Sequence, residues 1–208
     1  QILVYGDSLT WGIIPDTRER WPFETRWPGV MERTLVKAGH EVRVIEDCLN
    51  GRRTVWDDPF KPGGNGRIGL EQRIEVNSPL AMVVLMLGTN DFQSVHDFNA
   101  GHSAQGIAAL VRAVKLAPIE PGMPAPKILI VAPPEIHEAK GVMAPKFEGA
   151  RAKCAGLATT YAAVARELAC AFFDAGAVTT TSRVDGVHLD ADQPELVGGA
   201  LAAVVGPL

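Results

Sequence analysis

The chain has 208 residues, of which 47% are hydrophobic and 21% are charged. This composition excludes a disordered or collagen-like chain, and the length suits one domain, which we expect to span residues 1–208. Twenty basic residues against 24 acidic ones leave a net charge of -4, so nucleic acid is not an expected partner. The longest apolar run, residues 80–87, is too short to cross a bilayer, so no membrane partner is expected.

Three cysteines lie far apart in the sequence, at Cys48, Cys154 and Cys170, and no C-x-x-C pair occurs. An odd count without such a pair argues against a disulfide framework and favours a reducing compartment. The sequence shows no signal peptide before its first apolar segment, so we expect a cytoplasmic protein. Neither a metal nor a cofactor is expected.

Strand and helix signals alternate along the chain. Short apolar runs at residues 2–5, 42–45, 81–87, 128–132 and 171–173 predict five buried strands. Residues 28–37, 70–75, 103–116 and 192–205 predict helices, with Ser103 as the N-cap of the third. One further long helix is predicted from an apolar stripe, formed by Phe147, Ala150, Cys154, Leu157, Tyr161, Val164 and Leu168. Such alternation predicts a three-layer α/β/α sandwich with a central parallel sheet of about five strands.

Polar residues follow the predicted strands at their carboxyl ends. In an open parallel sheet these ends meet at one edge, and ligands bind there. A serine, an asparagine, a glycine, an acid and a histidine are therefore expected side by side. The residues concerned are Gly6, Asp7 and Ser8, then Asn50 and Gly51, then Gly88, Thr89, Asn90 and Asp91, and after the last strand Asp185 and His188.

Ser8, His188 and Asp185 have the residue types that nucleophilic catalysis needs. A serine hydroxyl requires a base to take its proton, and the base requires an orienting partner. Asp185 precedes His188 by three residues in a bent loop, so its carboxylate can hold one imidazole nitrogen while the other faces Ser8. Read alone, Ser8 is as typical of a helix N-cap, and Asp185 of a surface turn. Their meeting at one sheet edge favours a catalytic site.

A tetrahedral intermediate also needs hydrogen-bond donors for its oxyanion. The backbone N–H groups of Ser8 and Gly51 and the side-chain amide of Asn90 are the candidates. Asp7 and Leu9, which flank Ser8, and Trp11 are expected in the wall of a substrate pocket.

Residues 64–69 match the G-x-G-x-x-G pattern of dinucleotide-binding loops, but they follow a Pro- and Gly-rich loop. A dinucleotide site needs a strand, a turn and a helix in succession, so we do not expect one here.

Four blocks of this sequence resemble, in order, the conserved blocks of the SGNH, or GDSL, hydrolases. They are Gly6-Asp7-Ser8-Leu9, Gly51, Gly88-Thr89-Asn90-Asp91 and Asp185-Gly186-Val187-His188. The resemblance implies a flavodoxin-like sandwich and hydrolysis of small carboxylic esters through an acyl-enzyme. It also implies that Ser8, His188 and Asp185 are catalytic, with Ser8, Gly51 and Asn90 as the oxyanion hole.

Within the family, residues 6–12 and Gly51-Arg52-Arg53-Thr54 resemble the arylesterase/perhydrolase branch, which is best known from mycobacterial acyltransferases. This branch implies acyl transfer to alcohols or hydrogen peroxide and a homo-oligomer with a restricted apolar entrance. Arg53 departs from the branch, which usually reads Gly-Arg-Thr-Thr. The departure leaves the catalytic roles intact but leaves the loop contacts and perhydrolysis open.

Two alternatives to an arylesterase remain open. A thioesterase/lysophospholipase or a carbohydrate deacetylase of the same family uses the same triad, and pocket shape decides among them. A noncatalytic binding module would carry a broken triad, and none of the three residues is replaced here.

Overall fold

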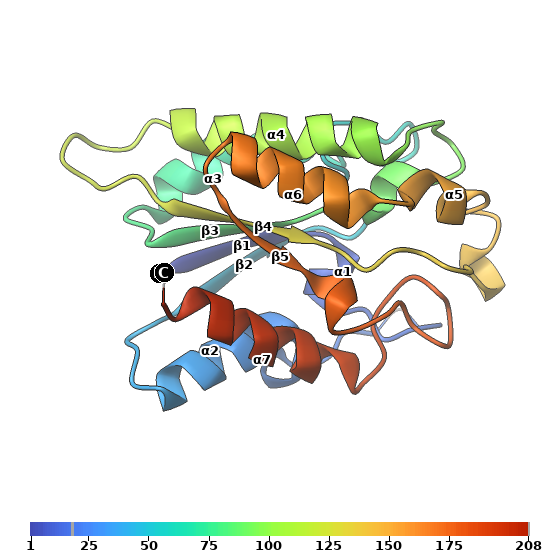
Figure 1. Ribbon diagram of the computed structural model, residues 1–208, viewed down its shortest axis with the longest axis horizontal. Helices are drawn as coiled ribbons and strands as arrows, with labels where there is room; N and C mark the ends of the chain where they lie inside the picture. Colours follow the sequence, from blue (N-terminus) through green and yellow to red (C-terminus); the bar gives the residue numbers. More distant parts are fainter. Residues whose placement is uncertain (18, 208) are drawn as a thin grey trace.

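The computed structural model describes residues 1–17 and 19–207 (Figure 1). One five-stranded sheet has the order β2-β1-β3-β4-β5, and every neighbouring pair is parallel. This confirms the predicted central parallel sheet. The strands are β1 (Ile2–Gly6), β2 (Val44–Cys48), β3 (Met82–Met86), β4 (Lys127–Ala132) and β5 (Ala171–Asp174).

Helices cover both faces of the sheet, as the predicted three layers require (Figure 1). The single-turn helix α1 (Ser8–Trp11) directly follows β1. One face is covered by α2 (Trp27–Lys37) and α7 (Gln193–Val205), which pack against each other. The other face is covered by α3 (Leu70–Asn77), α4 (Ala100–Leu116), α5 (Ala150–Cys154) and α6 (Leu157–Glu167).

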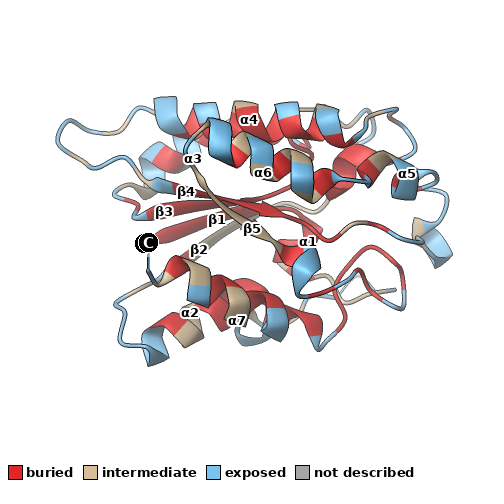
Figure 2. Cartoon of the chain, viewed as in Figure 1, coloured by how far each residue is buried: buried red, intermediate tan, exposed pale blue. Residues whose placement is uncertain are grey.

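The hydrophobic core consists of two clusters, one on each face of the sheet (Figure 2). Leu3 and Tyr5 of β1 belong to the cluster under α4 and α6, whereas Ile2 and Val4 belong to the cluster under α2 and α7. Successive side chains of a strand point to opposite faces, so both sets are buried only because both faces are covered. This double burial explains why β1 and β3 are continuous apolar runs without alternation.

Strand β2 begins and ends later than the predicted range of 42–45. It continues through Glu46 and Asp47, which pairing with β1 brings beside Val4 and Tyr5. An edge strand can carry such charges if they have partners. Arg26 lies 2.8 Å from Glu46 and Arg52 lies 2.8 Å from Asp47, so these carboxylates are neutralised at the sheet edge.

Helix α4 begins three residues before the predicted start, and the prediction of Ser103 as its N-cap is wrong. Asn99 is the N-cap, and its side chain accepts a hydrogen bond from the His102 N–H at 3.1 Å. The hydroxyl of Ser103 is instead buried and donates to Asp91 Oδ2 at 2.7 Å.

The single long helix predicted after residue 147 is two helices, α5 and α6. Gly156 between them has a φ of 80°, and Ala155 has an extended ψ of 127°, so the helical ladder stops there. Five residues of the predicted stripe are nevertheless buried in the core, namely Phe147, Ala150, Cys154, Leu157 and Tyr161. The apolar pattern therefore located the buried face correctly but did not reveal the break.

Glycines in the 64–69 segment serve loop packing. A Cβ on Gly66 would lie 2.6 Å from the carbonyl oxygen of Arg53 and 2.7 Å from that of Thr54. The Gly66 N–H also donates to the Arg53 carbonyl at 3.1 Å. The absence of a side chain at Gly66 thus lets this loop close onto residues 53 and 54.

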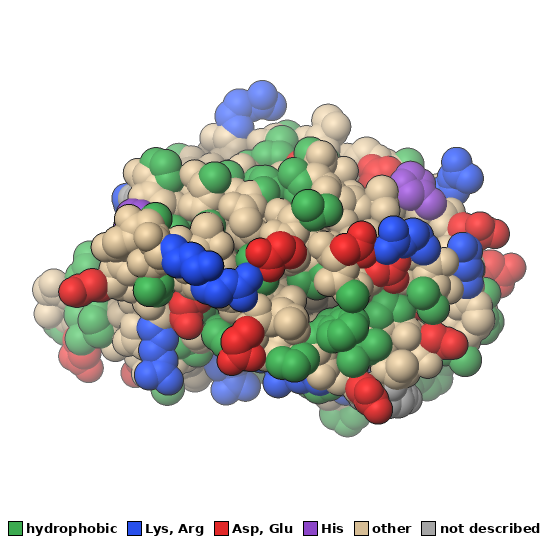
Figure 3. Space-filling view, turned by 90° about the horizontal axis from the view of Figure 1, so that it is seen from below, with side chains coloured by type: hydrophobic (Ala, Val, Ile, Leu, Met, Phe, Trp, Pro, Cys, Tyr) green, Lys and Arg blue, Asp and Glu red, His purple; other side chains and the backbone are tan. Residues whose placement is uncertain are grey.

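The outer face formed by α2 and α7 carries basic and acidic side chains interspersed with apolar ones (Figure 3). Among the helices of residues 1–17 and 19–207, none has the length and hydropathy needed to cross a membrane.

Two neighbouring glycines in α7 give a test of the packing between α2 and α7. A Cβ on Gly198 would lie 2.6 Å from both the Trp27 carbonyl oxygen and the Val30 Cβ, whereas a Cβ on Gly199 meets nothing within 4 Å. We predict that Gly198→Ala lowers the free energy of unfolding in urea by ~1–3 kcal/mol through overpacking. Gly199→Ala should raise it by ~0.5–1 kcal/mol, because alanine is the better helix former. Equal effects of the two variants would contradict the packing described here.

Candidate active site

Four segments meet at the carboxyl ends of the strands. Ser8 is the first residue of α1, directly after β1, and the side chain of Asp7 caps this helix by accepting the Leu9 N–H at 3.0 Å. Asn90 lies in a short 3-10 helix (Thr89–Phe92) after β3. Gly51 follows β2, and His188 lies in the loop before α7. The strand-end rule therefore placed the expected residues correctly.

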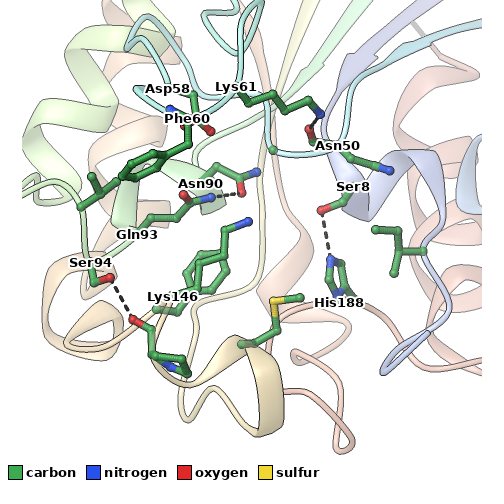
Figure 4. Close-up of a pocket in the computed structure, with 16 residues that line it drawn as sticks. Ser8, Asn50, Asp58, Phe60, Lys61, Asn90, Gln93, Ser94, Lys146 and His188 are labelled. Atoms are coloured by element: carbon green, nitrogen blue, oxygen red, sulfur yellow. Dashed lines mark hydrogen bonds between the residues drawn. The ribbon is translucent and has the colours of Figure 1, made fainter. Parts of the chain in front are cut away.

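Ser8, His188 and Asp185 form a continuous line of hydrogen bonds (Figure 4 shows the Ser8–His188 bond). Ser8 Oγ lies 3.1 Å from His188 Nε2, and His188 Nδ1 lies 2.6 Å from Asp185 Oδ2. All three side chains are buried. An ionised carboxylate only accepts hydrogen bonds, so the imidazole proton is assigned to Nδ1, and Nε2 is left to accept from Ser8.

Asp185 is held in its ionised form. Burial alone would raise the pKa of its carboxyl, but hydrogen bonds from the His188 ring and from the His188 and Val187 N–H groups outweigh this. The pKa of Asp185 is consequently below its usual value. Both N–H groups donate to Oδ1 at 2.9 Å, so Oδ2 remains for the imidazole.

Two backbone N–H groups, those of Ser8 and Gly51, are candidate oxyanion donors. Neither donates to another protein group among the described residues. Gly51 has a φ of 82°, a left-handed conformation that favours glycine. Ser8 and Gly51 both line the same cavity.

The side-chain amide of Asn90 is fixed at both ends. Its oxygen accepts from Gln93 Nε2 at 2.7 Å. Its nitrogen donates to Asp7 Oδ2 at 3.0 Å and to the carbonyl oxygen of Arg52 at 3.2 Å. Both amide hydrogens thus have protein acceptors, so a hydrogen bond from Asn90 to an oxyanion requires one of them to be shared.

Asp7 is a buried acid one residue before the candidate nucleophile. Desolvation raises the pKa of its carboxyl to about 6, although the Leu9 N–H, His188 and the Asn90 amide each act to lower it. Its two oxygens accept from the Leu9 N–H and from Asn90, so Asp7 joins the helix that carries Ser8 to the segment that carries Asn90.

A cavity of about 550 Å³ opens at Ser8 and His188 (Figure 4). Charged side chains in its wall are Asp58, Lys61 and Lys146. Its apolar wall includes Ile13, Phe60, Val95, Met143 and Phe147. The cavity therefore offers apolar surface beside the serine and a few polar groups, as small-molecule sites do.

The expectation that Asp7, Leu9 and Trp11 form the pocket wall is wrong for this cavity, since none of the three lines it. Asp7 is buried beneath it, and Leu9 belongs to the hydrophobic cluster under α2 and α7. Trp11 instead packs under Arg20, whose guanidinium lies 4.7 Å from its ring centre. Leu9 and Trp11 of α1 therefore make their contacts outside the cavity, which sequence spacing alone did not reveal.

A buried hydrogen-bond network around Asp91 was not predicted from the sequence. Asp91 accepts hydrogen bonds from the Thr54 N–H, the Thr54 hydroxyl and the Ser103 hydroxyl, and Ser103 is bonded to Tyr161. These contacts tie the segment after β3 to the loop after β2 and to α4 and α6. No local sequence pattern signals this network, because Thr54, Ser103 and Tyr161 lie 12 or more positions from Asp91 or from each other.

Within residues 1–17 and 19–207, no group of three or more His, Cys, Asp or Glu side chains is arranged to hold a metal ion.

A sequence model of the GDSL-like Lipase/Acylhydrolase family matches residues 4–195. The chain therefore belongs to this family, and by class it is a carboxylic ester hydrolase of the arylesterase type.

Individual relatives agree with this class. An arylesterase from Vibrio mimicus is 32% identical over 91 residues, which cover 44% of this chain and 38% of that protein. The inhibitor-bound aryl esterase of M. smegmatis is 36% identical, with a TM-score of 0.94 over 100% of this chain and 98% of that one. Est24, a carbohydrate acetylesterase from Sinorhizobium meliloti, is 35% identical, with a TM-score of 0.93 over 99% of this chain and 98% of that one.

The raised pKa of Asp7 predicts a specific pH dependence of stability. Below pH 3.8 the carboxyl is protonated in both the folded and the unfolded chain. As the pH rises to about 6, the unfolded chain loses this proton first, which favours unfolding. The stability of the wild type relative to Asp7→Asn should therefore fall by ~3 kcal/mol between pH 3.5 and pH 7.

Urea unfolding of both proteins across this range measures the difference, and any fixed cost of the asparagine cancels. A relative stability that rises with pH would contradict the raised pKa.

Proposed function

We propose that this chain is a serine esterase that hydrolyses small aryl and acetyl esters through a Ser8-His188-Asp185 triad and an acyl-enzyme. The observation that carries the proposal is the hydrogen-bonded line from Ser8 through His188 to an ionised Asp185, with Ser8 and His188 opening into the cavity. We also propose that residues 1–208 form a single domain, since all these residues lie at one edge of one sheet.

The first half-reaction acylates Ser8. His188 Nε2 takes the hydroxyl proton as Ser8 Oγ attacks the ester carbonyl, and Asp185 stabilises the imidazolium that forms. As the tetrahedral intermediate collapses, His188 returns the proton to the leaving alcohol or phenol. The C–O bond of the ester breaks, and the acyl group remains on Ser8 Oγ.

The second half-reaction removes the acyl group. His188 takes a proton from a water molecule, whose oxygen attacks the acyl carbonyl, and the proton then returns to Ser8 Oγ. In both halves the negative charge on the carbonyl oxygen faces the N–H groups of Ser8 and Gly51, with the Asn90 amide as a third donor. One such donor is worth a factor of ~10²–10³ in rate.

Acyl transfer to an alcohol or to hydrogen peroxide is the proposed side activity. It requires that the second nucleophile competes with water for the acyl-enzyme. Phe60, at 83% exposure, and Val95 stand at the cavity wall as exposed apolar side chains, which suits a mouth covered by another subunit of a homo-oligomer. Light scattering tests the oligomer, and the product ratio of alcoholysis to hydrolysis tests acyl transfer.

A carbohydrate acetylesterase is the second candidate function. It is favoured by the full-length similarity to Est24, whose described activity is of that kind. Turnover of p-nitrophenyl acetate, an acetylated sugar and an acyl thioester under identical conditions separates the arylesterase, deacetylase and thioesterase alternatives.

Two serines of the cavity give a matched test of the proposed nucleophile. Ser8→Ala should lower kcat on p-nitrophenyl acetate by roughly 10⁴–10⁶-fold, because the triad acts as a unit. Ser94 also lines the cavity, but its hydroxyl donates to the Pro145 carbonyl at 2.9 Å and not to His188. Ser94→Ala should therefore keep kcat within ~3-fold.

The assignment of Ser8 as the nucleophile fails if Ser8→Ala turns over normally.

A further inference from the structure

The guanidinium of Arg53 lies fully buried behind the cavity wall, with 0% exposure. Its NH1 forms an ion pair with Asp58 Oδ2 at 2.8 Å, and its NH2 donates to Gln93 Oε1 at 2.6 Å. Its Nε has no hydrogen-bond partner among the described residues. A buried cation with few partners is costly, and apolar side chains often replace buried ion pairs without loss of stability. Its two contacts therefore need an explanation other than stability.

Gln93 connects Arg53 to the candidate active site. A side-chain amide has one end that accepts and one end that donates, and a guanidinium can only donate. Arg53 therefore holds the oxygen of Gln93, which leaves the nitrogen of Gln93 to face Asn90 Oδ1 at 2.7 Å. Arg53, Gln93 and Asn90 thus form a hydrogen-bond relay. Arg53, at one end of this relay, sets the direction of the hydrogen bond between Gln93 and Asn90.

The amide of Asn90 is oriented in the same way. Because Asn90 Oδ1 accepts from Gln93, its NH₂ group must point the other way, toward Asp7 Oδ2 and the Arg52 carbonyl. In this orientation an oxyanion beside Ser8 can share one of the two amide hydrogens of Asn90, which lines the same cavity. A flipped amide would present an oxygen there and would repel a developing oxyanion.

We propose that Arg53 is a positioning residue that fixes the polarity of the Gln93 and Asn90 amides, so that the NH₂ group of Asn90 faces the oxyanion. The inference rests on the proposed esterase function for its effect on rate, but not for the amide orientation itself.

The second contact of Arg53 reaches the cavity wall. Asp58 lines the cavity, and its Oδ1 also accepts the Phe60 N–H at 2.9 Å. Through Asp58, Arg53 therefore holds the turn that carries Phe60. We expect loss of the Arg53–Asp58 ion pair to change KM, because Asp58 lines the cavity where substrate would bind. Loss of the Arg53–Gln93 hydrogen bond should instead change kcat, because it acts on the oxyanion through Asn90.

A double-mutant cycle tests whether Arg53 acts through Asn90. On p-nitrophenyl acetate, Arg53→Met should lower kcat by ~10–10²-fold, and Asn90→Ala by ~10²–10³-fold. Adding Arg53→Met to Asn90→Ala should change kcat less than ~2-fold, because the amide that it orients is gone. Losses that multiply would overturn the proposal, as would an unchanged kcat in Arg53→Met.

Two further variants separate the relay from a loss of folding. Arg53→Lys keeps a donor-only side chain and should recover most of kcat. Gln93→Glu keeps an acceptor for Arg53 but replaces the amide nitrogen with an oxygen, which cannot donate to Asn90 Oδ1 when the carboxylate is ionised. The kcat should therefore fall while the protein stays folded. Full kcat in Gln93→Glu would contradict the relay. Arg33→Met, which removes an exposed ion pair with Glu195, is the control and should leave both kinetic constants unchanged.

The side-chain amide signals of Asn90 and Gln93 in ¹⁵N–¹H spectra give a readout that needs no activity. Both should shift or double in Arg53→Met and stay close to the wild type in Arg53→Lys. Signals unchanged in Arg53→Met would overturn the proposal. If the wild type hydrolyses no ester, the proposed function fails, while these spectra still decide whether Arg53 orients the amides.

Discussion

The buried amide of Asn90 is the junction on which the geometry of the site depends. It accepts from Gln93 and donates to Asp7 and to the Arg52 carbonyl, so it joins the segments that follow β1, β2 and β3. Each strand end is itself fixed by parallel pairing within the sheet. A side chain with two donors and one principal acceptor suits a place where three chain segments meet, because it can satisfy all of them without carrying charge.

The buried carboxyl groups at this sheet edge are stabilised by hydrogen bonds from the protein rather than by solvent. Desolvation raises the pKa of Asp7 and of Asp91, whereas the hydrogen bonds from His188 and the backbone overcome desolvation at Asp185 and lower its pKa. The acid that must stay ionised in the proposed mechanism is thus the one whose hydrogen bonds outweigh its desolvation. The same edge contains Arg53, a cation whose burial costs free energy and whose contacts fix the direction of neighbouring amides.

The sequence was sufficient to predict the layers, the parallel sheet and the meeting of Ser8, Gly51, Asn90, Asp185 and His188. These predictions depend on local apolar runs and on the rule that polar residues after parallel strands share one edge. The predicted range of β2 was wrong because the strand continues through two charged residues. An edge strand can carry such charges when arginines from elsewhere in the chain neutralise them.

Side-chain direction and contacts between distant residues were not predictable in the same way. Trp11 was expected in the pocket because it lies near Ser8 in sequence, but the turn of α1 carries it under Arg20. The contact between Arg53 and Gln93 joins residues 40 positions apart and depends on how two loops close over each other. No local pattern records such a closure, although the unusual arginine within Gly51-Arg52-Arg53-Thr54 marks its position.

The most direct test of the account is to find which atom becomes covalently modified when an organophosphonate ester enters the cavity. Intact-mass analysis followed by peptide mapping makes this measurement on the folded wild-type protein. The account predicts one phosphonyl group per chain, attached to Ser8, because among residues 1–17 and 19–207 only the Ser8 hydroxyl is hydrogen-bonded to a histidine that an ionised carboxylate orients. A stable adduct on another residue such as Ser94, or no adduct in a protein that hydrolyses esters, would contradict it.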